Sequence, residues 1–417
     1  MNAEIIAVGS ELLLGQITNT NARFLSMHLA ELGINVYHHT VVGDNADQLE
    51  KAIAIAEERA DLIIFSGGLG PTKDDLTKET IARHLGTELA MDEEALESIE
   101  EFFIRAKRPM TENNKKQALV LAGSDVLVNR HGMAPGMLYK HDDRVYMLLP
   151  GPPKEIEPMF QFEAKPKLAH MLNKAEVILS HVLRFYGIGE AELEDRLQDI
   201  LDAQTNPTIA PLASDGEVTL RITAKTDTEE EAWELIQKEK QAILARVGDY
   251  LYGYDDDSLA SKVVDLLSES GKTISAAESL TAGLFQSELA AIPGASAVLE
   301  GGVITYSEQA KKDQLGLSPE LLELHGTVSE DTAIAMAEAC RRKFGTDVSV
   351  ALTGAAGPDA HGDQPAGTVW IGIATADGVN AYRLQLSGMR NTNRLRAVKL
   401  ALSYLIRTLT NNKTRKI

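Results

Sequence analysis

The chain has 417 residues, a length that favours two or three domains. Hydrophobic residues make up 44% and charged residues 24%, which is typical of globular proteins and excludes disordered and fibrous classes. With 41 lysines and arginines against 61 aspartates and glutamates, the net charge of −20 repels nucleic-acid phosphates and anionic lipid. A single cysteine excludes a disulfide framework and a cysteine-based zinc site.

The sequence shows neither an apolar run long enough to cross a membrane nor a signal peptide at its start. We therefore expect a cytoplasmic protein with no membrane partner.

Short apolar strands alternate with amphipathic helices over residues 1–172. Strands are expected at 5–8, 36–42, 61–65 and 145–149, and helices at 19–32, 47–59, 93–106 and 113–121. This alternation is typical of a mainly parallel sheet with helices on both faces. The sequence therefore predicts an α/β domain over 1–172.

Two further parts are predicted after the first domain. The first is a small α+β module over 173–252, with strands at 177–186 and 217–226 and helices at 190–201 and 229–247. The second is another α/β domain over 253–417. Its strands are expected at 273–277, 302–306, 348–352, 368–374 and 381–386, and its helices at 259–270, 280–291, 308–315, 331–344 and 391–409. The predicted fold class is α/β, with two three-layer α/β domains joined by the small module.

A glycine-rich turn follows the predicted strand 61–65, at the sheet edge where ligands usually bind. Its glycines let backbone amides approach an anion, a threonine adds a hydroxyl, and carboxylates follow directly or arrive from the end of another strand. These residues are Gly67, Gly68, Gly70, Thr72, Asp74, Asp75 and Asp44. Carboxylates beside bound phosphates indicate a bridging divalent cation. The alternative is a tight turn before a solvated helix N-terminus, where the dipole alone favours aspartate.

Residues 67–77 resemble the signature of the molybdopterin-binding fold and, more narrowly, the first domain of the competence/damage-inducible CinA family. Residues 9–15, 19–21, 42–45 and 149–153 fit that family too. The resemblance implies a divalent-metal-dependent pyrophosphatase acting on ADP-ribose, with the metal's identity open. It implies that Asp44 and Asp75 are the acidic, metal-associated pair, with Asp74 beside them. It also implies that Glu11 and Asn19 bind substrate together with the turn.

Ser279 lies between a predicted strand and a predicted helix. A serine there can act as a nucleophile with the first helical amides as an oxyanion hole, or it can simply cap the helix. Lys311, near the start of the next helix, would have a lowered pKa if partly desolvated, and could then deprotonate a serine. The alternative is that Lys311 and Lys312 are solvated helix residues.

Two more strand ends are predicted to reach the same edge. Residues 353–358 are small, so that their backbone can contact a ligand, and Arg390 follows a later strand. Arg390 and the loop amides could bind a phosphate group of the substrate and so fix its position.

Together these segments resemble the C-terminal CinA domain, which also occurs alone as nicotinamide mononucleotide deamidase. The resemblance implies that Ser279 is the nucleophile and Lys311 the general base. It implies that Tyr306 assists, that Thr353 contacts the reacting centre and that Arg390 binds the phosphate. The further substrate contacts implied are Thr281, Gly283, Gly354, Ala355 and Gly357. No cofactor is expected here.

One residue departs from the signature of this domain. Ala282 stands where the family often has glycine. Its methyl group is either tolerated at this position or narrows the pocket.

The middle module resembles the KH-type insert of CinA proteins. Residues 174–250 carry 8 lysines and arginines against 16 aspartates and glutamates, and the turn 187–190 lacks the G-x-x-G spacing that clamps a phosphate backbone. We therefore expect a KH-like spacer or dimerisation element without a nucleic-acid partner. Cys340 is expected to be a buried small hydrophobe.

The sequence thus predicts a homodimeric, bifunctional hydrolase of pyridine-nucleotide salvage, with nicotinamide mononucleotide and ADP-ribose as its small-molecule substrates. One rival interpretation is a non-catalytic nucleotide- or molybdopterin-binding partner in DNA uptake or the response to DNA damage. Another is that only one of the two sites is active, since fold does not imply function.

Overall fold

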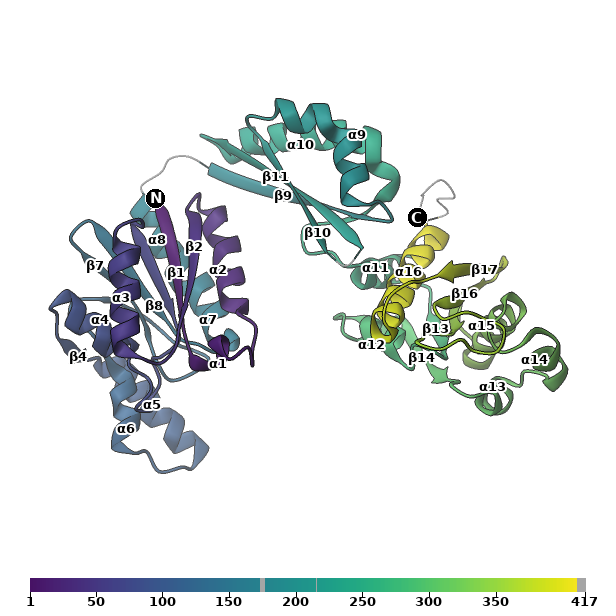
Figure 1. Ribbon diagram of the computed structural model, residues 1–417, viewed down its shortest axis with the longest axis horizontal. Helices are drawn as coiled ribbons and strands as arrows, with labels where there is room; N and C mark the ends of the chain where they lie inside the picture. The colour runs from purple at the N-terminus through teal and green to yellow at the C-terminus, as the bar shows by residue number, and fades with distance from the viewer. Residues whose placement is uncertain (173–176, 215, 411–417) are drawn as a thin grey trace. The chain divides into compact units, whose positions relative to one another are not determined.

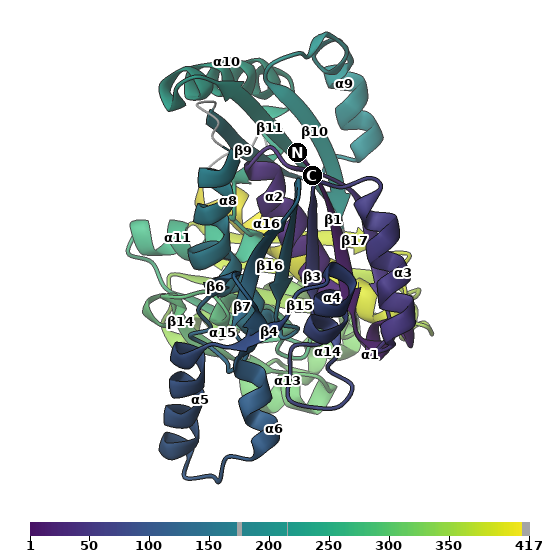
Figure 2. The same cartoon turned by 90° about the vertical axis from the view of Figure 1, so that its left-hand side faces the viewer.

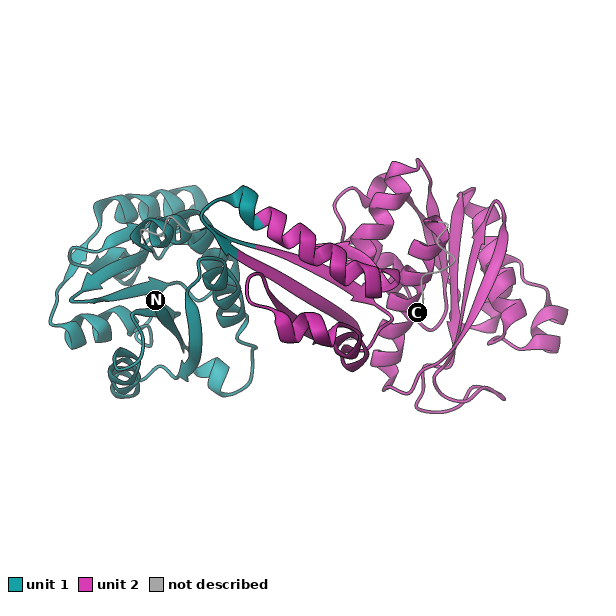
Figure 3. Ribbon diagram, turned by 90° about the horizontal axis from the view of Figure 1, so that it is seen from above, with its two compact units in different colours: residues 1–179, 225–232 teal, residues 180–224, 233–417 magenta. Residues whose placement is uncertain are grey.

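The computed structural model describes residues 1–172, 177–214 and 216–410. It divides into two compact units, residues 1–179 with 225–232 and residues 180–224 with 233–417 (Figure 3). The predicted boundary between the first domain and the middle module borders residues 173–176, which lie outside the described residues.

A six-stranded sheet forms the centre of the first unit, in the order β2-β1-β3-β8-β7-β6. The strands β1, β2, β3 and β8 run parallel, while β7 runs antiparallel to both of its neighbours, β8 and β6. The bounds are β1 Asn2–Val8, β2 Asn35–Val42, β3 Leu62–Ser66, β6 Asp125–Leu127, β7 Gly136–His141 and β8 Arg144–Leu149. Because successive side chains point to opposite faces, Ile5 and Ile6 enter two separate hydrophobic cores.

Helices cover both faces of this sheet (Figure 1 and Figure 2). One face packs against α2 Thr20–Glu31, α7 Pro153–Met159 and α8 Lys165–Leu172, and the other against α3 Ala46–Glu57 and α4 Thr77–Leu85. The remaining elements are α1 Ser10–Leu13, β4 Leu89–Met91, α5 Glu93–Ala106, α6 Glu112–Lys115, β5 Leu119–Leu121 and short turns at Lys116–Ala118 and Phe160–Ala164.

The helix predicted over 113–121 is wrong. The α6 helix ends at Lys115, and Leu119–Leu121 instead forms β5, which pairs antiparallel with β4. Val120 and Leu121 are buried in the core, so strand pairing and burial override the local helical pattern. The sequence predicted a helix after the glycine-rich turn without giving its bounds, and α4 is that helix.

The middle module is a four-stranded antiparallel sheet in the order β10-β11-β9-β12. Its strands are β9 Val177–Tyr186, β10 Thr208–Ser214, β11 Glu217–Thr226 and β12 Leu251–Tyr254, and its helices are α9 Glu190–Ala203 and α10 Glu229–Val247, followed by a short turn at Gly248–Tyr250. Both helices lie on one face of the sheet (Figure 1). The sequence did not predict β10, and β12 spans the predicted division between residues 252 and 253.

The last domain has a five-stranded sheet in the order β14-β13-β15-β16-β17. The first three strands of this order are parallel, and β16 and β17 form the predicted antiparallel hairpin. The strands are β13 Ile274–Glu278, β14 Leu299–Ile304, β15 Val348–Gly354, β16 Thr368–Thr375 and β17 Gly378–Gln385.

Helices again form the outer layers. Those on one face are α11 Leu259–Glu269, α12 Leu284–Ala290 and α16 Arg390–Leu409; those on the other are α13 Glu308–Leu315, α14 Pro319–His325 and α15 Glu330–Phe344. A short turn lies at Ala295–Ala297, and α14 was not predicted. The predicted α/β fold class is thus confirmed. Over the part of the chain that the structure describes, no helix combines the length and apolarity needed to cross a membrane.

Candidate active sites

Ser279 directly follows β13, at the carboxyl end of the parallel strands. Its side chain is only 7% exposed, and its amide donates to the carbonyl of Leu352 at 2.8 Å. The Nζ of Lys311 lies 3.1 Å from its Oγ. Gly283, rather than Ser279, occupies the N-cap of α12. The capping role considered for Ser279 is therefore excluded.

Lys311 is 2% exposed, and its Nζ also donates to the carbonyl of Thr305 at 2.9 Å. Burial lowers the pKa of Lys311 to about 8, against the opposing effect of Glu308. Lys312 differs, because it forms an ion pair of 2.6 Å with Glu308 on the helix surface. The two lysines thus have different environments, and Lys311 is a buried amine next to a serine hydroxyl.

A buried carboxylate determines how the chain turns after Ser279. Glu278 is fully buried and accepts the amides of Gly283, Phe285 and Gln286 at 2.9, 3.1 and 2.9 Å. These are the first amides of α12, which the sequence had suggested as an oxyanion hole. They are bonded to Glu278, so these three amides are not available as an oxyanion hole.

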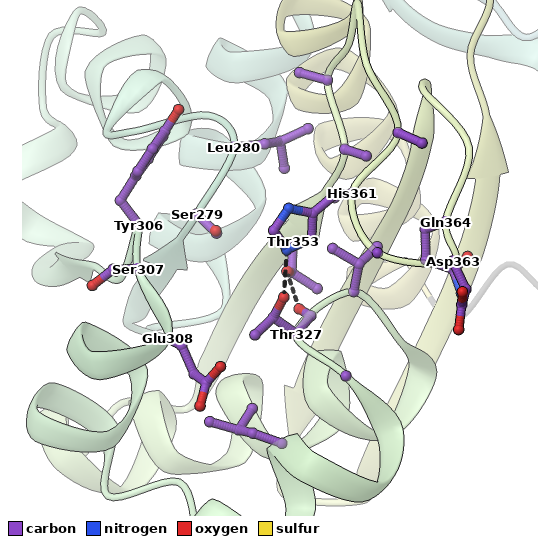
Figure 4. Close-up of a pocket in the computed structure, with 18 of the residues that line it drawn as sticks. Ser279, Leu280, Tyr306, Ser307, Glu308, Thr327, Thr353, His361, Asp363 and Gln364 are labelled. Carbon is purple, nitrogen blue, oxygen red and sulfur yellow. Dashed lines mark hydrogen bonds between the residues drawn. The ribbon is translucent and has the colours of Figure 1, made fainter.

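A cavity of 760 Å³ opens in front of Ser279 (Figure 4). The predicted site residues that line it are Ser279, Tyr306, Lys311, Thr353, Gly354, Ala355, Gly357 and Arg390. The structure does not bring Thr281 or Gly283 to this cavity: Thr281 is fully buried, and the amide of Gly283 is bonded to Glu278.

Ala282 does not line the cavity either, and its side chain is exposed. Its methyl group therefore does not narrow the pocket. The residue has a φ of 52°, in the left-handed region that glycine adopts freely and other residues adopt at a cost.

Arg390 ties two of the loops together. Its Nη1 donates to the carbonyl of Gly357 at 2.8 Å and its Nη2 to the hydroxyl of Tyr306 at 2.7 Å. A guanidinium has five N–H donors, so these two bonds leave donors for a ligand.

Sequence reasoning missed several polar residues of this cavity, among them Thr327 and His361. Thr327 accepts the hydroxyl of Thr353 on its carbonyl at 2.6 Å, and its own hydroxyl lies 2.9 Å from Nε2 of His361 (Figure 4). Both lie in loops far from Ser279 in sequence. The only available signal was the concentration of polar residues after Pro358.

In the first domain, a cavity of 560 Å³ lies at the carboxyl ends of the parallel strands. The predicted residues that line it are Glu11, Asn19, Asp44, Gly67, Gly68, Gly70, Thr72, Asp74 and Asp75. The structure therefore brings together the whole residue set that the sequence proposed for this site.

Many of these polar groups already have partners within the protein. The amide and hydroxyl of Thr72 both donate to Oδ2 of Asp75, at 2.9 and 2.6 Å. Asp44 accepts the amide and hydroxyl of Ser10 on its Oδ2 at 2.9 and 2.7 Å. The side chain of Asn19 accepts the amide of Ala22 and so caps α2.

Two glycines of this turn lie in close contact with other parts of the domain. A Cβ on Gly70 would lie 2.5 Å from Oδ2 of Asp75, and a Cβ on Gly67, whose φ is 105°, would lie 2.3 Å from the carbonyl oxygen of Val8. The α4 helix begins only at Thr77, so Asp74 and Asp75 precede it in the loop. Both aspartates thus lie directly before the helix, and the carboxylate of Asp75 accepts its hydrogen bonds from Thr72.

The fit of a divalent cation depends on the carboxylates. Within residues 1–172, 177–214 and 216–410, no group of three or more histidine, cysteine, aspartate or glutamate side chains is arranged to hold a metal ion. However, Mg²⁺ is usually bound by one or two carboxylates together with substrate phosphates. Asp44 and Asp75 therefore fit a cation that is shared with a bound diphosphate, rather than one held by the protein alone.

The two α/β domains and their sites define a modular protein whose parts each match a known family. Residues 4–170 match the family described as "Probable molybdopterin binding domain". Residues 180–253 match the family "Damage-inducible protein CinA KH domain", and residues 256–409 match the family "CinA C-terminal domain". The chain belongs to the CinA family of competence-damage inducible proteins.

Relatives match along almost the whole chain. A putative competence-damage inducible protein of Lysinibacillus sphaericus is 68% identical over 98% of both chains, and that of Bacillus subtilis is 53% identical, also over 98% of both. Among solved structures, the protein CinA with unknown function from Thermoplasma acidophilum is 36% identical, with a TM-score of 0.37, covering 40% of this chain and 96% of its own.

Proposed function

We propose that the last domain is an amidohydrolase that converts nicotinamide mononucleotide to nicotinate mononucleotide and ammonia. The observation that carries this proposal is the buried pair of Ser279 and Lys311, 3.1 Å apart, with the lysine pKa lowered to about 8. With this pKa a fraction of the amine is neutral near physiological pH, and a neutral lysine can activate a serine without a histidine.

In this reaction the neutral Nζ of Lys311 takes the proton of the Ser279 hydroxyl, and Oγ attacks the amide carbon. The tetrahedral intermediate collapses as Lys311 returns the proton to the leaving nitrogen, which releases ammonia. Water, deprotonated by the same amine, then hydrolyses the ester to nicotinate mononucleotide and free Ser279. The carbonyl of Thr305 holds Nζ in place during both steps. The free N–H donors of Arg390 are suited to the substrate phosphate.

The test is release of ammonia from nicotinamide mononucleotide by the full chain. We expect release by the wild type, loss in Ser279→Ala and Lys311→Met, and retention in Ser287→Ala, which changes an exposed serine of α12. The proposal fails if the wild type releases no ammonia, or if Ser279→Ala retains the activity.

We further propose that the first domain hydrolyses ADP-ribose to AMP and ribose 5-phosphate. This rests on the 560 Å³ cavity, in which the glycine-rich turn meets Asp44 and Asp75. A divalent cation bound there with the diphosphate would neutralise its charge and polarise the phosphoryl group under attack. The glycine-rich turn lines the cavity in which the diphosphate would lie, and the two carboxylates would orient the cation.

Two measurements test this second activity. We expect release of AMP that depends on a divalent cation and is lost in Asp75→Asn. Calorimetry should show weak binding of Mg²⁺ alone and tight binding together with ADP-ribose, and Asp44→Asn should weaken only the latter. Tight binding of Mg²⁺ alone would contradict a cation shared with substrate.

Cytoplasmic location and a homodimer remain part of the proposal, and light scattering of the purified chain tests the latter. The rival function is a non-catalytic partner in DNA uptake or the response to DNA damage. It predicts DNA affinity that falls steeply with salt, without turnover of either nucleotide. The net charge of −20 argues against it.

A further inference from the structure

Arg394, in the second turn of α16, bonds to the backbone next to Ser279. Its Nε donates to the carbonyl of Leu280 at 3.0 Å and its Nη2 to the carbonyl of Thr281 at 2.9 Å. Its Nη1 lies 3.2 Å from Oδ1 of Asn391. Arg394 does not line the cavity, so its bonds act on the turn rather than on a ligand.

The turn that Arg394 holds is strained. Ala282 has a φ of 52° and Gly283 a φ of 94°, so the chain reverses through two consecutive left-handed residues. For alanine this conformation is unfavourable and persists only where surrounding bonds impose it.

Two charged side chains supply those bonds, one on each side of the strained residues. The carboxylate of Glu278 accepts the amides of Gly283, Phe285 and Gln286 beyond them, and the guanidinium of Arg394 holds the carbonyls before them. Hydrogen bonds with a charged partner are stronger than neutral ones. The position of Ser279 therefore depends on both.

We propose that Arg394 is a positioning residue for the nucleophile. The two parallel N–H donors of its guanidinium hold the peptide carbonyls that follow Ser279, and this keeps Oγ within hydrogen-bond distance of Lys311. This rests on the proposed function in one respect, that Ser279 is the nucleophile. A lysine at position 394 cannot replace the guanidinium, because a single ammonium lacks two parallel donors at fixed spacing.

The same helix holds the other loops of the site through different residues. Asn393, which is 2% exposed, donates to the carbonyls of Ala356 and Gly388 at 3.0 and 2.8 Å. Arg390 lies in the cavity itself. The start of α16 therefore anchors the loops after several strands, and Arg394 is the residue assigned to the nucleophile turn.

The test follows the rate at which a fluorophosphonate probe modifies Ser279, because this reaction needs an activated serine but no nucleotide. We expect Arg394→Ala and Arg394→Lys to react at least 10-fold more slowly than the wild type, with the pH midpoint of the reaction unchanged. Arg396→Ala, which changes an exposed arginine of the same helix, should react at the wild-type rate. Thermal unfolding establishes that each variant is folded. If Arg394→Ala does not fold, the labelling rate of Arg394→Lys alone tests the proposal.

A second substitution separates positioning from general destabilisation. Introducing Ala282→Gly into Arg394→Lys removes the strain of the left-handed alanine, so we expect recovery of several-fold in the labelling rate. Wild-type labelling of the folded Arg394 variants, a moved pH midpoint, or no recovery with Ala282→Gly would each overturn the proposal.

The outcome also separates this proposal from the proposed function. Labelling of Ser279 that depends on Arg394, without release of ammonia from nicotinamide mononucleotide, would refute the substrate and leave the positioning role standing. A wild type that is not labelled at Ser279 would refute both.

Discussion

Replacing Lys311 with methionine should abolish the proposed amidohydrolase activity and yet stabilise the protein. Burial lowers the pKa of Lys311 from 10.5 to about 8, which means that the folded state disfavours the ammonium. At 1.36 kcal/mol for each tenfold change in proton affinity, the charged amine destabilises the fold by about 3 kcal/mol. Methionine has a similar length and removes this penalty, but it leaves the carbonyl of Thr305 without its donor, at about 1–2 kcal/mol. The expected net gain is about 1–2 kcal/mol at neutral pH.

The gain should depend on pH in a defined direction. Because the folded pKa lies below the unfolded value, the penalty is complete below about pH 8 and disappears as the pH rises through 10.5. The advantage of Lys311→Met should therefore fall by more than half between about pH 7 and about pH 9.5.

Differential scanning calorimetry of the full chain measures this effect. One transition should rise by about 2–6 °C at neutral pH, given the size of the domain. The control is Lys312→Met, which removes an ion pair at the surface and should change stability by less than about 0.5 kcal/mol. An unchanged or lowered transition in Lys311→Met, or a gain that does not shrink at high pH, would refute the reasoning that Nζ is buried and partly charged.

Three further predictions follow from individual contacts. Ammonia release should increase with pH and level off above about 8, because the reaction needs the neutral amine of Lys311; a rate independent of pH would contradict this role. Ala282→Gly should stabilise the protein by about 1 kcal/mol by relieving the left-handed alanine, and a lower Tm would count against it. Gly70→Ala should reduce ADP-ribose hydrolysis at least about 10-fold by displacing Asp75, whereas Gly189→Ala, where a Cβ meets nothing within 4 Å, should not.

Much of the fold could be predicted because its signals are local. The parallel strands are short apolar runs, and their carboxyl ends converge at one edge of each sheet. This is why Ser279 and Lys311, 32 positions apart, were expected to lie close together, and the structure places them at one cavity. The prediction for residues 119–121 was wrong because their pairing with β4 is a contact between residues distant in sequence, which helical periodicity does not report.

Details of the sites were less predictable, since they depend on which partner each polar atom finds. Thr72 looked like a phosphate ligand, but the folded loop directs its hydroxyl to Asp75. The amides at the start of α12 looked free, but Glu278 accepts them. In both cases a nearby carboxylate competes with a ligand for the same donors, and the outcome depends on loop geometry that sequence patterns do not encode.

The capping of α12 by Glu278 has a consequence for how the protein opens. The residue before the nucleophile also accepts the first amides of the helix, so fraying of the first turn of α12 would displace Ser279 at the same moment. The amides of Gly283, Phe285 and Gln286 should therefore resist hydrogen exchange as strongly as the central strands, unlike those of an ordinary active-site loop. In this domain the nucleophile belongs to the cooperative core of the fold, and inactivation on heating should coincide with global unfolding rather than precede it.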